Sequence, residues 1–371
     1  MSTRSAILAA HRWVGVALAL FLALQGLSGA ALAFRDVGNL LLHGPALRVV
    51  PAGEPLPVSA LLDAVRAAHP GARVARVEYP AGPGRAFLFR LADGRGARYA
   101  SVDPYSGAVL RSAPLYAWPV ELLAQWHDNM LLGGPGANAV GLLGLGLLAM
   151  AATGPVLWWP GARRLGSAFT VRLGSGSYRA VLDLHRVPGA VLAAVLLLGA
   201  LTGIAMAWRG PVLAALGTVL PTAPSPAPTV PPGDGPVMGL DAVVALVRQD
   251  AGGLPVRNLR LLGPGGTLVH VYLEDGGAGP PGAARQAWAD ARTGAILARA
   301  GGPGTPAGDA LLEWMLPVHS GVVAGTAGRL LVAVAGLGLA MLSITGLWVW
   351  TRKRGFRRQQ LAKRKAPAKA A

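Results

Sequence analysis

The sequence predicts an α-helical membrane protein: a four-helix transmembrane bundle with an internal two-fold repeat, plus two small α+β modules outside the membrane. Hydrophobic residues make up 53% of the chain and charged residues only 14%, which is more apolar surface than a soluble core needs. Runs of the roughly 20 apolar residues that a helix needs to cross a bilayer occur at 13–34, 138–159, 187–208 and 328–350. Segments of the first half recur in the second half, which indicates duplication.

The first span, within residues 1–35, shows the repeat most clearly. Its sequence from His11 to Arg35, HRWVGVALALFLALQGLSGAALAFR, returns in the third span, 185–209, as HRVPGAVLAAVLLLGALTGIAMAWR. The start of the chain also resembles a secretory signal, with Arg4, an apolar run and a possible Ala-Leu-Ala cleavage site at 31–33. We favour a retained span because the matching copy lies in the middle of the chain.

Two polar segments follow the odd-numbered spans, and each predicts a small helix-plus-sheet module. Residues 36–121 contain a helical stripe at 58–69 and short alternating runs at 74–79, 86–91, 97–102 and 108–110. Residues 210–310 begin with a Pro-rich linker and then predict a helix at 240–249 and strands at 256–261, 267–273, 285–289 and 295–297. The turn segments SVDPYSGAVL and WADARTGAIL match, so we expect the module to be duplicated.

The second and fourth spans also match each other. Residues 122–160 and 311–351 are each expected to begin as a helix outside the membrane and to continue as a span. An offset of 192 residues sets His127 against His319, and also aligns Thr153-Gly154 with Thr345-Gly346. The whole chain therefore reads as two copies of span, module and span.

The distribution of basic residues predicts the topology. The formal net charge is +17, and much of the excess lies in the loop at 161–184 and in the basic tail at 352–371. Short basic segments remain in the cytoplasm, so both termini are expected there and the two modules outside. The tail is interpreted as an anchor near anionic lipid rather than as a nucleic-acid binding site.

Histidines are the candidate metal ligands, because the chain has no cysteine and therefore no thiolate zinc site, iron–sulfur cluster or c-type haem. His11 and His185 open spans one and three, whereas His127 and His319 precede spans two and four. A parallel repeat would bring each pair face to face. Two opposed imidazoles suit a noncovalent haem, so the sequence predicts two haem b groups as cofactors. Copper or zinc, and ordinary interfacial histidines, are the alternatives.

Further residues are candidates for contact with these haems. Arg12 and Arg186 are expected to pair with propionates at one end of the bundle, and Arg329 at the other. His43 is a possible alternative ligand or relay. Eighteen residues separate His11 from Gly29, or ~27 Å of helix, which puts the glycine in the opposite leaflet. Four hydroxyl–glycine pairs are therefore candidates for haem packing, with plain helix packing as the alternative: Ser28-Gly29, Thr153-Gly154, Thr202-Gly203 and Thr345-Gly346.

Over nearly its whole length the chain resembles the PepSY-associated transmembrane (PepSY-TM) family, which includes iron-regulated inner-membrane proteins and ferric-siderophore reductases. The likeness rests on HRWVG with QGLSGAALAF, on WHDNMLLG, HRVPGA and HSGVVAGTAGRLL, on TGLWVW, and on the two D-x-x-x-G-A-[VI]-L segments. The resemblance implies a dihaem protein of the bacterial inner membrane with periplasmic PepSY-like modules. His11 and His185 would be the inner ligands, and His127 and His319 the outer ligands.

The resemblance further implies an oxidoreductase that passes electrons outward to a ferric siderophore or another ferric chelate. No catalytic residue is assigned beyond the haem ligands. The sequence shows no flavin or nicotinamide fingerprint, so the electron donor is expected to be a cytoplasmic partner or a quinol. A non-enzymatic PepSY regulator or assembly factor, and a metal transporter, are the alternative functions.

Overall fold

The computed structural model describes residues 2–94, 96–174, 176–224, 226–230, 238–274 and 284–365, and leaves out the side chains of 93, 284 and 357–365. Part of the predicted Pro-rich linker and the last six residues of the basic tail lie outside the described residues. The chain divides into two units. We call Met1–Ala33, Ala124–Trp208 and Val318–Ala371 the helix bundle, and Phe34–Leu123 with Arg209–Pro317 the sheet domain.

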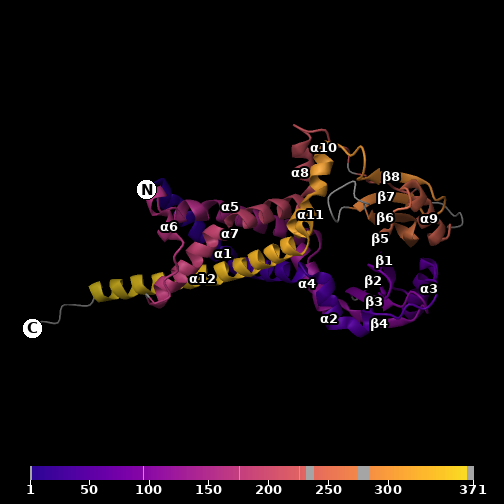
Figure 1. Ribbon diagram of the computed structural model, residues 1–371, viewed down its shortest axis with the longest axis horizontal. Helices are drawn as coiled ribbons and strands as arrows, with labels where there is room; N and C mark the ends of the chain where they lie inside the picture. The colour runs from indigo at the N-terminus through magenta and orange to yellow at the C-terminus, as the bar shows by residue number, and fades with distance from the viewer. Residues whose placement is uncertain are drawn as a thin grey trace, which may run out of the picture. The chain divides into compact units, whose positions relative to one another are not determined.

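Four long helices form the helix bundle: α1 (Thr3–Leu32), α5 (Gly134–Trp158), α7 (Ser177–Ala207) and α12 (Gly325–Lys365). Each contains a stretch long and apolar enough to cross a membrane; in the fourth this stretch is Val322–Phe356. The helices lie side by side in Figure 1. The four predicted spans are therefore confirmed, and the chain is a membrane protein with four candidate spans.

Short helices connect these spans. The helix α4 (Pro119–Asn129) leads toward α5, and α11 (Met315–His319) with η4 (Val322–Ala324) leads into α12. On the opposite side of the bundle η2 (Ala162–Arg164) and α6 (Leu165–Ala168) lie between α5 and α7. The histidines at 127 and 319 therefore lie in short helices just before the second and fourth spans.

The packing of the bundle repeats from one half to the other. Gly146 on α5 lies against Leu18 on α1, and the equivalent Gly338 on α12 lies against Leu192 on α7. In each case a methyl group on the glycine would collide with the leucine side chain, so the absence of a side chain allows the two helices to approach closely. The contact between α1 and α5 is thus reproduced between α7 and α12.

The sheet domain contains eight strands and several helices. Its first half comprises α2 (Arg35–Leu47), α3 (Val58–Ala68), β1 (Arg73–Glu78), β2 (Phe87–Asp93), β3 (Gly96–Val102), β4 (Val109–Pro114) and η1 (Leu115–Ala117). The second half comprises α8 (Arg209–Leu216), α9 (Leu240–Asp250), β5 (Val256–Leu262), η3 (Pro264–Gly266), β6 (Leu268–Glu274), β7 (Ala284–Asp290), β8 (Ile296–Ala300) and α10 (Ala307–Glu313).

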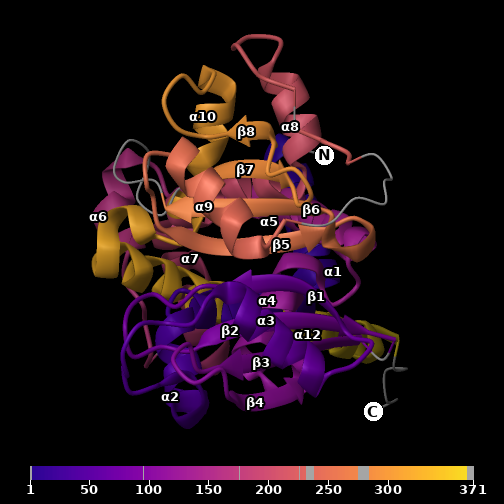
Figure 2. The same ribbon diagram turned by 90° about the vertical axis from the view of Figure 1, so that its right-hand side faces the viewer.

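The predicted fold class is wrong in one respect: the two small modules are a single antiparallel sheet. The strand order is β4-β3-β2-β1-β5-β6-β7-β8, which Figure 2 shows as one continuous stack. The join is the pairing of β1 with β5, in which Val77 faces Leu259. Separate modules would each leave an open strand edge with unpaired backbone groups, and the β1–β5 pairing satisfies both edges at once.

One hydrophobic core serves both halves of the sheet domain. The helices α3 and α9 cover the same face of the sheet (Figure 2), and their apolar stripes contribute fully buried side chains, including Leu61 and Val243, to a common cluster. Asp241 at the start of α9 accepts hydrogen bonds from the backbone N–H groups of Val58 (2.7 Å) and Ser59 (3.1 Å) at the start of α3. The two halves therefore form one folding unit rather than two modules.

Candidate functional site

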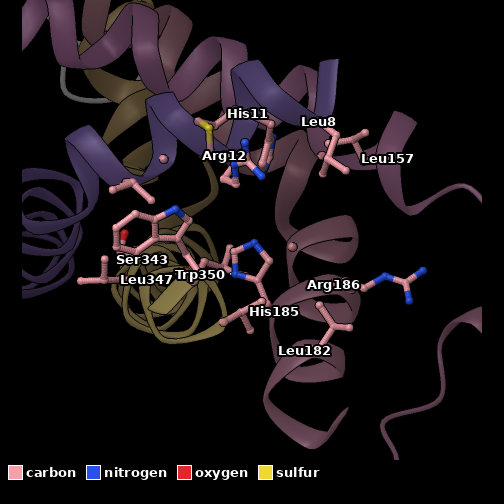
Figure 3. Close-up of a pocket in the computed structure, with 18 of the residues that line it drawn as sticks. Leu8, His11, Arg12, Leu157, Leu182, His185, Arg186, Ser343, Leu347 and Trp350 are labelled. Atoms are coloured by element: carbon pink, nitrogen blue, oxygen red, sulfur yellow. Dashed lines mark hydrogen bonds between the residues drawn. The ribbon is translucent and has the colours of Figure 1, made fainter. Parts of the chain in front are cut away.

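The first histidine pair lies at one end of the bundle, where α1 carries His11 and α7 carries His185. Both imidazoles line a cavity of about 580 Å³ between the spans. Figure 3 shows the two side chains on facing helices, with Trp350 of α12 beside them. A cavity of this volume is in the range of small-molecule and cofactor sites.

The wall of this cavity is mostly apolar and aromatic, with a few cationic groups. The Nε atom of Arg12 is buried and has no hydrogen-bond partner among the described residues, and its guanidinium lies 5.4 Å from the ring centre of Trp13. An unpartnered N–H of a cation in the cavity wall suits an anionic ligand group. Arg186 also lines the cavity, but in Figure 3 its guanidinium extends away from His185.

The second histidine pair joins the two short helices that precede the even-numbered spans. His127 on α4 and His319 at the end of α11 have ring centres 6.0 Å apart, with ring planes inclined by 58°. Burial lowers the pKa of both imidazoles to about 4, and His319 is further disfavoured as a cation by the nearby His127. Both are therefore neutral at pH 7, which is the form that ligates a metal ion.

Each hydroxyl–glycine pair lies against one of the four histidines. Their hydroxyl oxygens lie 2.7–3.2 Å from an imidazole Nδ1, in the combinations Thr153 with His11, Ser28 with His127, Thr345 with His185 and Thr202 with His319. The neighbouring glycine leaves space for the ring: a methyl group at Gly346 would lie 2.9 Å from Cε1 of His185, and one at Gly29 3.0 Å from Cε1 of His127. We call each hydroxyl–glycine pair a histidine seat.

The family described as PepSY-associated TM region matches residues 8–353, which is most of the chain. The chain belongs to this family. The match includes both histidine pairs and the complete sheet domain, and it confirms the resemblance to PepSY-TM proteins. Among curated proteins, none matches the chain.

Two further residues of this PepSY-TM protein were singled out from the sequence, Arg329 and His43. Arg329 is a half-buried residue near the start of α12. His43 belongs to the sheet domain, where its buried ring lies 4.6 Å from that of Trp118. Burial, together with the charge of Arg111, lowers the pKa of His43. Within the described ranges, no three or more His, Asp or Glu side chains gather as a potential metal site.

One polar residue beside the second pair was not among the predicted site residues. The amide Nε2 of Gln25 on α1 donates a hydrogen bond of 2.7 Å to the backbone carbonyl of His127, so it ties the short helix α4 to the first span. A polar side chain inside an apolar run is a signal of function. The equivalent position in the third span is Gly199, so the repeat gave no support to this assignment.

Proposed function

We propose that this PepSY-TM protein holds two haem b groups and carries electrons across the membrane to a ferric chelate, as a ferric-siderophore reductase. The observation that carries the proposal is the presence of two opposed imidazole pairs, one at each end of a single helix bundle. His11 and His185 would hold one group, and His127 and His319 the other.

The number of ligands favours haem over a bare metal ion. Structural zinc sites use four protein ligands and catalytic ones three, whereas the described residues offer only two imidazoles at each end. A haem iron already has four nitrogen ligands from its ring and takes only axial ligands from the protein. The absence of cysteine from the chain fits a noncovalent haem.

The surroundings of the first pair also fit a haem. Its cavity of about 580 Å³ has apolar and aromatic walls suited to the flat ring, and the unpartnered Nε of Arg12 suits a propionate carboxylate. When bound, the haem supplies reversible one-electron transfer. The imidazoles hold the iron, the apolar helices exclude water, and Arg12 offsets the carboxylate charge.

The direction of transfer follows from the charge distribution along the chain. We propose that the basic segments at 161–184 and 352–371 stay in the cytoplasm of a bacterial inner membrane, which places the His11–His185 end inside and the sheet domain in the periplasm. Electrons from a cytoplasmic partner or a quinol would then leave at the His127–His319 end. Each ferric ion takes up one electron, and the resulting Fe(II) binds hard oxygen chelators more weakly.

Haem quantification in the purified full chain tests the cofactor assignment. The wild type is expected to show b-type bands in a reduced-minus-oxidised spectrum, with two haems per chain. His11→Ala and His185→Ala should each remove one haem, and His127→Ala and His319→Ala the other. His69→Ala, in the sheet domain, is the matched control and should retain both. A wild type without b-type bands, made with adequate haem, would exclude the proposal.

The same variants separate the alternative functions. A regulator or assembly factor that uses its spans only as anchors predicts no chromophore in any sample. A metal transporter predicts bound copper or zinc that disappears with the histidines. For reduction itself, the dithionite-reduced protein is mixed with a ferric siderophore under argon. Reoxidation of the haem bands with formation of one Fe(II) per electron is the expected result.

A further inference from the structure

We propose that the hydroxyl groups of the four histidine seats are positioning residues that fix the tautomer of each candidate ligand. In this assignment each hydroxyl oxygen accepts a hydrogen bond from the Nδ1–H of one imidazole, so that Nε2 carries the free lone pair. The ligand role of Nε2 rests on the proposed function, whereas the tautomer is a property of the chain alone. Ser28, Thr153, Thr202 and Thr345 are the four residues concerned.

The distances define four separate hydrogen bonds of the same type. The imidazole Nδ1 lies 2.7 Å from the Thr153 hydroxyl in His11 and 3.0 Å from the Ser28 hydroxyl in His127. In the second half Nδ1 lies 2.9 Å from the Thr202 hydroxyl in His319 and 3.2 Å from the Thr345 hydroxyl in His185. All four use Nδ1, and among the described residues no hydrogen bond reaches Nε2 of these histidines.

The hydrogen of each hydroxyl is already committed to its own helix. Thr153 donates to the carbonyl of Ala149 (2.6 Å), and Ser28 donates to that of Gln25 (3.0 Å). The other two donate to carbonyls four residues earlier, Thr202 to Leu198 and Thr345 to Met341, both at 2.8 Å. A hydroxyl has one hydrogen and two lone pairs, so while it donates to the carbonyl its oxygen accepts from the imidazole. In this arrangement Nδ1 carries the proton.

For His185 a second contact indicates the tautomer, whatever the orientation of the Thr345 hydroxyl. Its Nδ1 also lies 3.0 Å from the backbone carbonyl of Leu342. A carbonyl oxygen cannot donate, so this contact is a hydrogen bond only if Nδ1 carries the proton. Because the other three seats repeat the arrangement of Thr345, the same assignment applies to all four.

The seats also connect the two spans within each half of the repeat. The helix α1 carries His11 and the seat of His127, while α5 carries the seat of His11. In the second half α7 carries His185 and the seat of His319, and α12 carries the seat of His185. Each half therefore orients both of its imidazoles by itself. Assembly of the two halves brings the rings of His127 and His319 within 6.0 Å of each other and places His11 and His185 in the wall of one cavity.

This arrangement has the chemistry of an outer-shell partner. A metal-ligating histidine usually donates its second ring N–H to an oxygen acceptor, which fixes the ring orientation and raises the basicity of the ligand nitrogen. Loss of such a partner typically weakens metal affinity about 10- to 100-fold. The glycine of each seat contributes by allowing the ring edge to reach the hydroxyl.

The test uses two substitutions at one seat. Thr153→Val keeps the shape of the side chain but removes the oxygen, and Thr153→Ser keeps the hydroxyl. The full chain is labelled with ¹⁵N-histidine, produced without haem, and studied by solid-state NMR. We expect the Nδ1–H tautomer for His11 in the wild type and in Thr153→Ser, and a mixture of tautomers in Thr153→Val. Thr351→Val, whose hydroxyl donates to the carbonyl of Trp348, is the control.

Haem titration of the same samples gives a second readout. Thr153→Val should bind haem about 10- to 100-fold more weakly at the His11–His185 end, and Thr153→Ser should restore the wild-type affinity. An Nε2–H tautomer in the wild type, or a Thr153→Val tautomer identical to it, would overturn the proposal. If Thr153→Val does not fold, Thr202→Val tests the seat of His319 in the same way. An Nδ1–H tautomer in a chain that binds no haem would refute only the proposed function.

Discussion

The helix bundle and the sheet domain both consist of two copies of one unit, but their copies differ in how much they have diverged. In the bundle, equivalent positions hold the same functional side chains, as with His11 and His185. In the sheet, Leu88 on β2 faces Ser101 on β3, whereas at the equivalent positions His270 on β6 faces Trp288 on β7. The rings of His270 and Trp288 stack at 4.0 Å.

The difference shows where both copies are needed for one site. Each imidazole pair takes one residue from each half of the chain, so a change in either half would remove one of its two imidazoles. On the sheet face that carries Leu88 and His270, by contrast, each half uses its own side chains. What the two sheet halves share is the buried face, where both α3 and α9 pack on one core.

The largest expected effect tests whether the sheet halves really share a core. Leu61→Ala on α3 removes a fully buried side chain and should destabilise the sheet domain by about 3 kcal/mol. Hydrogen exchange should rise equally in β3 and in β6, although β6 belongs to the other half. Leu297→Ala, at a residue that is 41% exposed, is the control. Faster exchange confined to β1–β4 would restore the picture of two modules.

The next prediction separates equivalent seats in the bundle. Gly346→Ala would bring a methyl group 2.9 Å from Cε1 of His185, whereas Gly154→Ala leaves 3.8 Å to Cε1 of His11. Overpacking typically costs about 1–3 kcal/mol, so haem affinity at this end should fall about tenfold in Gly346→Ala and remain near the wild-type value in Gly154→Ala. Gly199→Ala, with open space around it, should change nothing. Equal losses in Gly346→Ala and Gly154→Ala would contradict this geometry.

A further effect concerns the pH dependence of stability that arises from His270 on β6. Burial, together with the charge of Arg260, lowers the pKa of His270 to about 4, although the hydrogen bond that His270 donates to the amide oxygen of Gln286 acts in the opposite direction. The unfolded chain takes up this proton near pH 6.5 and the folded chain only near pH 4, so stability falls as the pH drops between these values. Denaturant unfolding at pH 7 and pH 5 should differ by about 2 kcal/mol from this residue.

The residue of the other copy provides the variant for this test. His270→Leu installs the side chain that Leu88 has at the equivalent position, and it should reduce the difference between pH 7 and pH 5 by that amount. If His270→Leu keeps the full wild-type pH dependence, the burial of His270 does not control it.

The smallest expected effect is a surface ion pair present in only one copy. Arg299 donates to both carboxylate oxygens of Asp250, at 2.6 and 2.7 Å; the equivalent positions hold Ser112 and Ala68. The bond from Arg299 lowers the pKa of Asp250, so the stabilisation is present at neutral pH and is lost as the pH falls through that lowered pKa. A double-mutant cycle with Asp250→Ala and Arg299→Ala should give about 0.5 kcal/mol, decreasing with salt. A larger coupling that is insensitive to salt would contradict a solvent-exposed pair.

The sequence was sufficient for most elements because their signals are local. The helices α3 and α9 and all eight strands lie within a few residues of their predicted positions. The four spans lie within helices that are longer than predicted: α1 begins at Thr3, α7 at Ser177, and α12 runs on to Lys365. The join of β1 to β5 was missed because these strands are more than 150 residues apart. An alternation of apolar and polar residues indicates which face of a strand is buried, but not which strand lies beside it. Two separate sheets and one continuous sheet have the same local sequence.

The sequence also predicted part of the candidate site. The repeat brought together the correct histidine pairs as neighbours, since equivalent residues of two copies face each other. The hydroxyl–glycine pairs were expected to contact a haem edge or a backbone, but the structure places them against the imidazoles. Sequence spacing gave their depth along the helix, while the direction of a side chain depends on how the helices are rotated about their axes.

The β1–β5 join has a symmetry of its own. Arg76 faces Arg260, Val77 faces Leu259 and Glu78 faces Asn258, and the equivalent of Glu78 in the second copy is Arg260. Such a register is isologous: when a residue of one copy faces a given residue of the other, the counterparts of these two residues also face each other. It is the contact that two identical chains of one span–strands–span unit would make as a homodimer. The segment that connects α5 to α7 makes this interface intramolecular, which keeps the two copies at equal stoichiometry while leaving each free to acquire its own surface.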